Sequence, residues 1–455
     1  MPVTNVSLKS STSPRPPGPA GIPLLGQALS FARDPITFLS GVARKYGDIA
    51  YFRLGSVDIF FVSHPDLVRE VLIAQRASFT ISPLRERLRG VVGQGLFTSH
   101  GVLHAQQRRL MQPVFRKSRI EGYAGHMVDF ARRTGHRWTP GAEIDAASEM
   151  MELTMFVAAK TLFGHDIKDD SDAVSRNVTM LLEYFTRLVS PFFSLLLKLP
   201  LPSTLRFRRA VRDLDAVIYR MIEQRRTRSG SDEDLLARLM QAKDDETQVQ
   251  MTERQLRDEV LTLLIAGHET TANLLAWTIY LVAQSPEADA RMHAEARTVL
   301  AGRECFSAAD TERMPYARQV VLEGLRMYPS GWFIGRAALA DVDLRGYTVP
   351  KGAVVMMSQY VMQRDARFYD APDRFMPERW TEKFESELPR GAYFPFSAGD
   401  RHCIGEGFAW QEALLILATL VERWKFELVP GQHIRPKPSV TLRPDRPIRV
   451  IVRAR

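Results

Sequence analysis

The segment from Thr252 to Gln284 constrains the fold of this chain more than any other stretch. It contains no proline, Thr252 and Gln255 have the spacing of a capping box, and Ser285-Pro286 ends the pattern. A helix of this length spans roughly 50 Å, which is long enough to cross a whole domain. Its second half, residues 273–283, is almost wholly apolar, so we expect it to be buried on most sides. The sequence therefore predicts a core built around one long helix.

The rest of the chain is predicted to be mainly α-helical with a small β region. Helical patterning dominates residues 102–336, and Pro65 begins a further helix that runs to about Ile73. Short alternating or β-branched runs predict a hairpin at 48–54 and 58–62 and strands at 341–347, 353–357 and 448–453. Residues 1–20 are a polar and proline-rich lead-in, and residues 21–455 are expected to form a single domain.

Composition narrows the class of partner. The 455 residues are 45% apolar and 25% charged, which is typical of a globular protein, and the net charge is +9. Nucleic acid, an anionic membrane surface or an acidic protein would each suit this charge, but no nucleic-acid-binding motif is present, and we expect no nucleic-acid partner. The apolar stretch 188–202 contains Pro191, Lys198 and Pro200, so it is too short and broken to span a membrane. We expect no integral membrane anchor, and we leave open whether this stretch touches a membrane surface.

Only two cysteines are present, Cys305 and Cys403. Two thiols exclude a disulfide framework and any site that needs four thiolates, such as a ferredoxin-type cluster. Such low cysteine use fits a cytoplasmic location. Cys305 stands in no motif and is interpreted as an incidental thiol.

Cys403 lies in a stretch that differs from an ordinary buried cysteine. Gly399 and Gly405 flank it and allow the backbone to turn sharply around the sulfur, and Arg401 brings a positive charge. An apolar helix is predicted for residues 408–421, directly after the turn. The amides at the start of that helix would stabilise a thiolate at Cys403.

The run Phe-x-x-Gly-x-Arg-x-Cys-x-Gly at residues 396–405 resembles the haem-binding signature of the cytochrome P-450 superfamily, the haem-thiolate monooxygenases. The resemblance implies that Cys403 is the axial ligand of the iron of haem b and that Phe396 shields the sulfur. It also implies the cytochrome P-450 fold, with the long central helix crossing the haem. The activity implied is insertion of one oxygen atom from O2 into an organic substrate.

Two further motifs occur in the order that this family shows. Glu323 and Arg326 share a helix face, and Arg379 follows in Pro-Glu-Arg; by resemblance the three form a buried structural network. Within the long helix, residues 266–271 resemble the acid–alcohol pair of the family, in which Glu269 and Thr270 relay protons to bound oxygen. Without the resemblance this stretch would read as a solvent-facing polar segment.

His268-Glu269 also begins the His-Glu-x-x-His pattern of zinc proteases. The fifth position is Ala272 rather than histidine, so that reading is excluded.

Haem carries two propionates, which need cationic or donor partners when they are buried. By resemblance these are Arg401, Arg336, His104 and Arg108. Many family members have tryptophan where His104 stands, so this position departs from the commoner pattern.

The electrons are expected from separate partners, a ferredoxin or a flavodoxin with its reductase, because the residues after Cys403 are too few for a reductase domain. The substrate is expected to be lipophilic, such as a fatty acid, terpenoid or polyketide. Its pocket would be closed by loops at 85–97 and 188–201, the second with Phe192 and Phe193. Other candidate lining residues are Ala266, Gly331, Trp332, Ile334, Val440 and Thr441. The alternatives are a peroxide-driven peroxygenase or isomerase on the same fold, and a haem-binding sensor without turnover.

Overall fold

The computed structural model describes residues 14–164, 176–178, 180–181, 199, 201–227, 234–244 and 248–455. The predicted lid at 188–201, with Phe192 and Phe193, lies outside the described residues apart from Leu199 and Leu201, whose side chains are exposed.

Helices make up most of the described chain, as expected. Their bounds are α1 Ala28–Arg33, α2 Pro35–Tyr46, α3 Pro65–Arg69, α4 Pro83–Arg87, α5 Arg89–Val92, α6 Gly101–Met111, α7 Lys117–Glu121, α8 Ala124–Arg137, α9 Ala146–Phe163, α12 Pro202–Thr227, α13 Leu235–Gln241, α14 Glu253–Ala283, α15 Pro286–Leu300, α16 Pro315–Met327, α17 Gln359–Met362, α18 Glu382–Glu387 and α19 Glu406–Arg423.

The strands are short. Their bounds are β1 Ile49–Leu54, β2 Val57–Val62, β3 Phe79–Ile81, β4 Glu143–Asp145, β5 Ile334–Ala338, β6 Val342–Leu344, β7 Tyr347–Val349, β8 Val354–Met357, β9 Trp424–Leu428, β10 Pro436–Pro438, β11 Leu442–Pro444 and β12 Arg449–Ala454.

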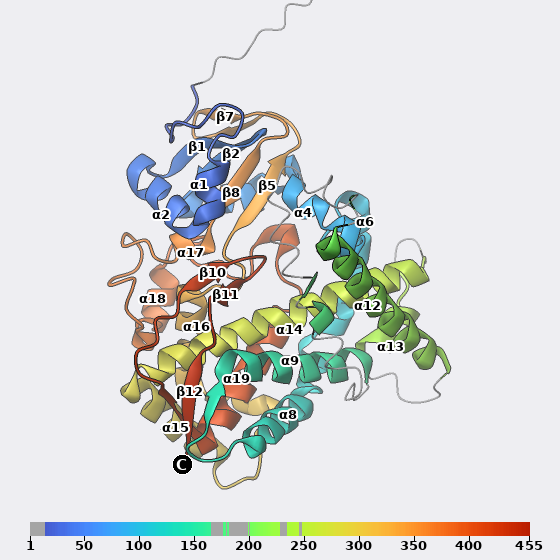
Figure 1. Ribbon diagram of the computed structural model, residues 1–455, viewed down its shortest axis with the longest axis vertical. Helices are drawn as coiled ribbons and strands as arrows, with labels where there is room; N and C mark the ends of the chain where they lie inside the picture. Colours follow the sequence, from blue (N-terminus) through green and yellow to red (C-terminus); the bar gives the residue numbers. More distant parts are fainter. Residues whose placement is uncertain are drawn as a thin grey trace, which may run out of the picture.

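The predicted long helix is confirmed as α14. The backbone N–H of Gln255 donates to Thr252 Oγ1 over 3.3 Å, and the backbone N–H of Thr252 donates to Gln255 Oε1 over 2.8 Å, which completes the capping box. The helix ends at Ala283, after which Ser285 caps α15 and Pro286 begins it. In Figure 1 α14 runs across the middle of the molecule, between the strand-rich end and the helices α8, α9 and α19. Helices α9, α16 and α19 all contact it, so residues 271–279 are buried on every side.

The largest sheet has the strand order β1-β2-β8-β5-β3. The predicted hairpin of β1 and β2 is confirmed, and β8 pairs parallel to β2. The predicted strand at 341–347 is instead a hairpin of β6 and β7, because Arg345 and Gly346 turn the chain with φ of +50° and +82°. The predicted strands at 353–357 and 448–453 are confirmed as β8 and β12.

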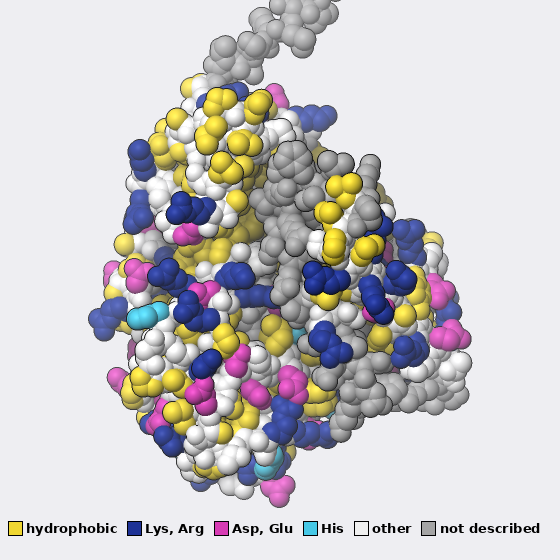
Figure 2. Space-filling model, viewed as in Figure 1, with side chains coloured by type: hydrophobic (Ala, Val, Ile, Leu, Met, Phe, Trp, Pro, Cys, Tyr) yellow, Lys and Arg dark blue, Asp and Glu magenta, His cyan; other side chains and the backbone are white. Residues whose placement is uncertain are grey.

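The described helices include none that is long and apolar enough to span a bilayer. On the face drawn in Figure 2, hydrophobic side chains gather at the end of the molecule that carries β1, β2 and α1, while basic and acidic side chains are scattered elsewhere. Ile22, Leu24, Leu25 and Leu29 are the exposed large apolar residues near the start of the described chain.

Candidate functional site

The loop before α19 presents Cys403 through a constrained backbone. Gly399 has φ of +67°, and a Cβ there would lie 2.0 Å from Leu72 O, so only glycine fits. The backbone N–H of Cys403 donates to Phe396 O over 2.9 Å, which closes the turn. Gly405, expected to permit the same kind of turn, has an ordinary φ of −89° and serves as the N-cap of α19.

The Cys403 side chain is exposed, while most residues of the loop around it are partly buried. Burial nevertheless raises the pKa of this thiol, while a backbone hydrogen bond from Gly405 and the charge of Arg108 act in the opposite direction. The amide at the start of α19 therefore acts on the pKa of Cys403 in the direction expected from the sequence, and burial acts against it. A metal ion bound at the sulfur would favour the thiolate further.

The four residues expected near the propionates converge beside this loop. Arg336 on β5 reaches Ser397 Oγ at 3.4 Å, and Arg108 on α6 donates to His402 O over 2.8 Å. Arg401 donates to Ser99 O over 2.7 Å, and its Nη1 is buried without a partner in the described chain. Burial lowers the pKa of Arg336 and Arg401 to about 10 each. Burial, together with the charges of Arg401 and Arg108, lowers the pKa of His104 to about 3, so His104 is neutral.

Arg85 on α4 belongs to the same group, although the sequence reading placed it only in a pocket loop. Burial and the charges of Arg336 and Arg401 lower its pKa well below the usual range. Its Nε is buried without a partner in the described chain, and its guanidinium lies 3.7 Å from the centre of the Phe97 ring. No spacing in the sequence marks Arg85, because the cations it joins come from other parts of the chain.

This group of side chains fits an anionic ligand. Among the described residues, no carboxylate lies within ion-pair distance of Arg85, Arg336 or Arg401. Buried cations of this kind are stable only with a counter-charge. A metalloporphyrin would suit this group, because its two carboxylates would neutralise the cations and its metal would bind the thiol of Cys403.

Helix α14 turns an open face toward this space. Ala266 is exposed and Thr270 is half-buried, whereas the residues that follow are fully buried. Thr270 Oγ1 donates to Ala266 O over 2.5 Å, and a Cβ built on Gly267 would meet no atom within 4 Å. The hydroxyl of Thr270 therefore keeps its lone pairs for a ligand or water on that side.

Glu269 is buried and ion-paired, whereas its polar surroundings in the sequence could equally indicate a solvent-facing side chain. Its side chain is 1% exposed, and its Oε1 accepts from Thr441 Oγ1 over 2.5 Å and from Arg443. Its Oε2 is buried with no partner in the described part of the chain. Thr441, expected to line the substrate pocket, is thus occupied as a donor to Glu269, and it also accepts from Asn273 Nδ2 over 3.2 Å.

Trp332 is a second correction to the expected pocket. It is 3% exposed, its Nε1 donates to Ser439 O over 2.8 Å, and it belongs to the apolar core under the sheet. Gly331, Ile334 and Val440 are partly buried. Phe396 is also partly buried, and its ring centre lies 6.3 Å from that of Trp410.

His268 is a buried residue of α14, 1% exposed. Burial lowers its pKa to about 3, and neither ring nitrogen has a hydrogen-bond partner in the described residues. The described residues contain no cluster of three or more His, Cys, Asp or Glu side chains able to hold a metal ion.

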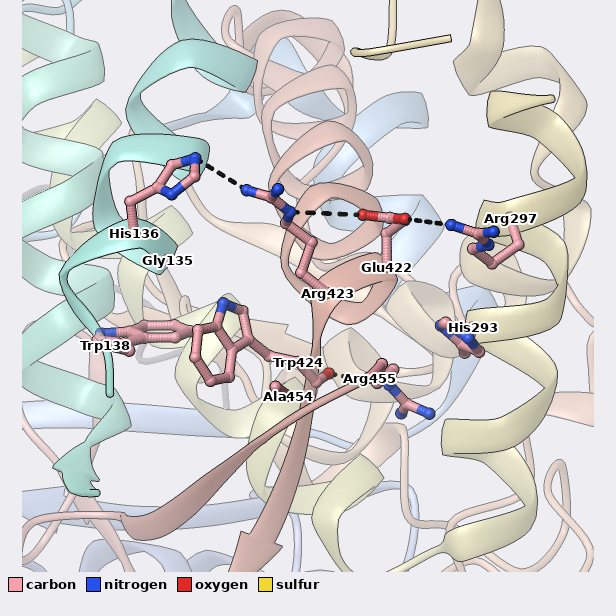
Figure 3. A pocket seen from close by; sticks show the side chains of 10 residues that line it. All are labelled: Gly135, His136, Trp138, His293, Arg297, Glu422, Arg423, Trp424, Ala454 and Arg455. Atoms are coloured by element: carbon pink, nitrogen blue, oxygen red, sulfur yellow. Dashed lines mark hydrogen bonds and ion pairs between the residues drawn. The ribbon is translucent and has the colours of Figure 1, made fainter. Parts of the chain in front are cut away.

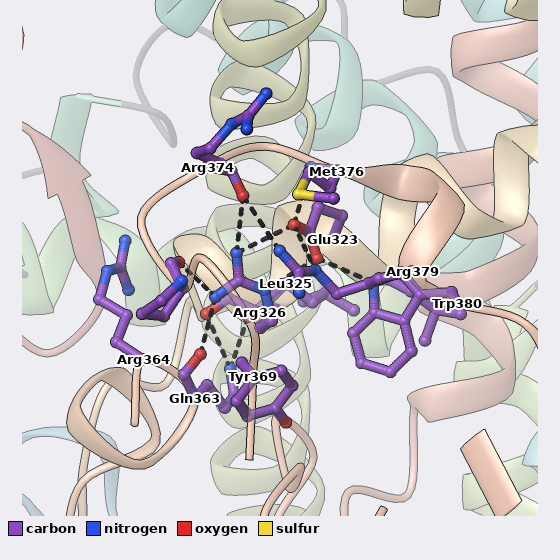
Figure 4. A network of polar contacts seen from close by, with 12 residues as sticks. Glu323, Leu325, Arg326, Gln363, Arg364, Tyr369, Arg374, Met376, Arg379 and Trp380 are labelled. Carbon is purple, nitrogen blue, oxygen red and sulfur yellow. Dashed lines mark hydrogen bonds and ion pairs between the residues drawn. The ribbon is translucent and has the colours of Figure 1, made fainter. Parts of the chain in front are cut away.

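The expected network of Glu323, Arg326 and Arg379 is confirmed (Figure 4). Glu323 and Arg326 are both 0% exposed and paired through two hydrogen bonds of 2.8 and 2.9 Å. Arg379 Nε and Trp380 Nε1 donate to the same carboxylate over 3.1 and 2.9 Å. Arg326 also donates to the carbonyls of Gln363 and Pro372, so it ties α16 to the loop that leads toward Cys403.

A pocket of about 530 Å³ lies elsewhere, at the ends of α8 and α19 (Figure 3). Its charges pair with one another: Arg297 contacts Glu422 at 2.9 Å, and Arg423 contacts His136 at 2.8 Å. Helix α19 starts beside Cys403 and ends at this pocket, about 27 Å away along its axis. The pocket is therefore separate from the site.

Comparison with known proteins agrees with this geometry. A family model described as Cytochrome P450 matches residues 16–452. Cyclooctatin synthase of Streptomyces melanosporofaciens is 38% identical over 435 residues, which cover 95% of this chain and 94% of that protein. Cyclooctat-9-en-7-ol 5-monooxygenase of the same organism is 36% identical over 431 residues, 93% of each chain. The structure of retinoic acid-bound cyanobacterial CYP120A1 has a TM-score of 0.87 and 26% identity, and it covers 98% of this chain and 100% of that chain.

Proposed function

The chain belongs to the cytochrome P450 family, and from that premise we propose that it oxidises a carbocyclic terpenoid. Its class is established by the family: it is a monooxygenase with haem b as cofactor. The observation that carries the assignment of its site is the exposed Cys403 thiol beside partly or fully buried arginines that have no carboxylate within ion-pair distance among the described residues. When bound, the haem supplies the activation of O2, one atom of which enters the substrate while the other leaves as water after two electrons and two protons have been taken up.

We propose that Cys403 ligates the iron and that Arg336, Arg401, Arg108, His104 and Arg85 bind the propionates. His104 is neutral and acts as a hydrogen-bond donor, whereas the arginines supply charge. The carbonyl of Phe396 accepts the backbone N–H of Cys403, and we propose that its ring shields the sulfur.

Thr270 and Glu269 are the proposed proton-handling residues. Thr270 points its hydroxyl along the open face of α14, where it accepts and passes on a proton. Glu269 has one oxygen anchored by Thr441 and Arg443 and a second oxygen that is buried without a partner in the described residues, and this second oxygen is the one that we propose to pass protons toward Thr270. Thr270→Ala is expected to leave substrate binding intact while more of the reducing equivalents end in peroxide or water. Unchanged coupling across several substrates would remove Thr270 from this role.

Electrons are proposed to arrive from a ferredoxin or flavodoxin that docks beside Cys403. Phe115 approaches Gly405 there, and the residues that follow it, Arg116, Lys117 and Arg119, are exposed. An acidic partner would be steered to this surface, so the reduction rate should fall as ionic strength rises. A rate that is insensitive to salt would contradict this docking site.

The two free thiols support a cytoplasmic location.

The terpenoid assignment rests on the activities named for the relatives and on partly buried apolar residues on α14 and elsewhere in the same cluster, among them Leu263, Leu96 and Val440. Purified ferric enzyme should show a ligand-induced shift of its haem absorption with cyclic terpene alcohols at lower concentration than with linear fatty acids. With a surrogate ferredoxin and reductase it should yield a product heavier by one oxygen atom. Tighter binding and turnover of linear acids would overturn the proposal.

A further inference from the structure

The loop from Gly93 to Ser99 is fastened to the first half of α14 by two neighbouring carboxyl groups. The backbone N–H of Gln94 donates to Asp258 Oδ2 over 2.8 Å, and the backbone N–H of Leu96 donates to Glu259 Oε2 over 2.9 Å. Asp258 is 5% exposed and Glu259 is 0% exposed. Adjacent helix residues thus satisfy alternate amides of one loop.

This fastening requires the loop backbone to lie directly on the helix. A Cβ on Gly93, whose φ is +74°, would lie 2.0 Å from Asp258 Oδ1, and a Cβ on Gly95 would lie 2.3 Å from Thr262 Oγ1. Both positions therefore demand glycine, for conformation at the first and for space at both. Gln107 Nε2 adds a hydrogen bond of 2.6 Å to Gln94 O from α6.

The other end of the loop is tied to the cofactor side of the molecule. Ser99 O accepts from Arg401, and Thr98 O accepts from Arg89 Nε over 3.0 Å. Between the two anchors stands Phe97, which is 38% exposed and stacks on Arg85. The loop thus joins α14, which carries Thr270, to the loop that carries Cys403, and it carries the partly exposed ring of Phe97.

We propose that Asp258 and Glu259 are positioning residues that hold Phe97 as a fixed wall of the substrate space. They touch neither the cofactor nor Thr270, and they act through the backbone amides of Gln94 and Leu96. The proposal rests on the haem site and not on the class of substrate.

The two carboxyl groups are held in different ways. Asp258 is ion-paired with Arg257 over 2.8 Å. In the described chain Glu259 Oε1 has no partner, and burial raises the pKa of Glu259 to about 8. A protonated carboxyl group still accepts the Leu96 amide through its carbonyl oxygen, so the anchor needs an acceptor rather than a charge.

The test uses the haem-loaded enzyme and compares Glu259→Leu with Glu259→Gln. Hydrogen exchange of the peptide that contains residues 93–99 should accelerate about 10-fold or more in Glu259→Leu, because the Leu96 amide loses its acceptor. Glu259→Gln keeps an acceptor of the same shape and should stay within about 3-fold of the wild type. Glu253→Leu, an exposed acid on the first turn of α14, is the matched control and should leave this peptide unchanged.

A second readout separates positioning of Phe97 from a general loss of structure. Imidazole is small and needs only the iron, whereas 4-phenylimidazole also contacts the walls of the site. In Glu259→Leu the dissociation constant for 4-phenylimidazole should change about 5-fold or more while that for imidazole stays the same, since only the wall has moved. Equal changes for both probes, or unaltered exchange of residues 93–99, would overturn the proposal. A preparation without haem or without the carbon monoxide complex of a thiolate-bound iron would instead contradict the assignment of Cys403.

Discussion

Two groups of partly or fully buried arginines differ in the partners that the chain provides for them. Arg326 and Arg379 share the carboxylate of Glu323, which also accepts from Trp380 Nε1 and the backbone of Met376. Arg85, Arg336 and Arg401 have no carboxylate within ion-pair distance in the described residues. The first group is neutralised by a carboxylate of the described chain, whereas in the second group only the more distant charge of Asp400 acts on Arg401.

This difference separates structure from function. A buried charge without a partner lowers the stability of the folded protein. Such charges are found at functional sites, where a bound ligand of opposite charge offsets this cost. The first group needs nothing from outside and holds the chain in place. The second group is poised for the two carboxylates of a cofactor that the family implies. Opposite responses to mutation should follow.

Glu323→Gln should give the largest effect. It leaves Arg326, which is 0% exposed, without its carboxylate, and breaking a buried pair of this kind costs about 3–5 kcal/mol. The free energy of unfolding from urea titration measures the loss, with and without haem. The matched control is Glu385→Gln on α18. It removes the partly exposed ion-pair partner of Arg318, which lies on α16 as Glu323 does, and it should cost less than about 1 kcal/mol. Equal losses for the two variants would show that the network is not the structural element described.

Arg336→Leu should produce effects of opposite sign in the two states of the protein. The pKa of Arg336 is lowered from 12.5 to about 10, and this difference corresponds to about 3 kcal/mol that the charge costs when no anion is present. Without haem the variant should therefore be as stable as the wild type or more stable, whereas loss of haem to an excess of apomyoglobin should be faster. A destabilised apoprotein with unchanged haem retention would place Arg336 in the structural group instead.

Glu412→Gln should give the smallest effect, and it tests a carboxyl group that has no arginine. Burial raises the pKa of Glu412 to about 8, against 4.5 for an ordinary glutamate, so the folded protein binds this proton more tightly than the unfolded chain. Stability is therefore expected to fall as pH rises from about 4.5 toward 8, by about 1 kcal/mol per pH unit from this group. Unfolding titrations between about pH 5.5 and 7.5 should show a shallower slope in the variant. Identical slopes in the variant and the wild type would mean that the pKa of Glu412 is not raised in the folded protein.

Several parts of the fold and site were accessible from local sequence alone. The ends of α14 follow from Thr252, Gln255 and Pro286, because capping and proline act within a few residues. The turn that presents Cys403 is equally local, since Gly399 is required by its own φ. The partners of Glu323 could be named because the family motifs name them.

Other parts were wrong or missing for a common reason. Trp332 and Thr441 were expected at the pocket, yet the structure turns one into the core and the other toward Glu269. Strand β5, which carries Arg336, was not predicted, because its pairing partners β3 and β8 are distant in the chain. Arg85 escaped notice for the same reason. A side chain's direction depends on contacts that no sequence window contains.

The order of residues in this chain was sufficient for its helical class, its longest helix and the cysteine that binds iron in its family. Those features depend on hydrogen bonds and backbone angles between near neighbours, which the amino-acid types govern directly. Only the tertiary structure shows which arginines are paired with a carboxylate and which are not. It alone also shows which carboxyl groups anchor the loop of Phe97, because these groups come from distant segments of the chain. Electrostatic energy depends on distance in space, and folding alone sets that distance.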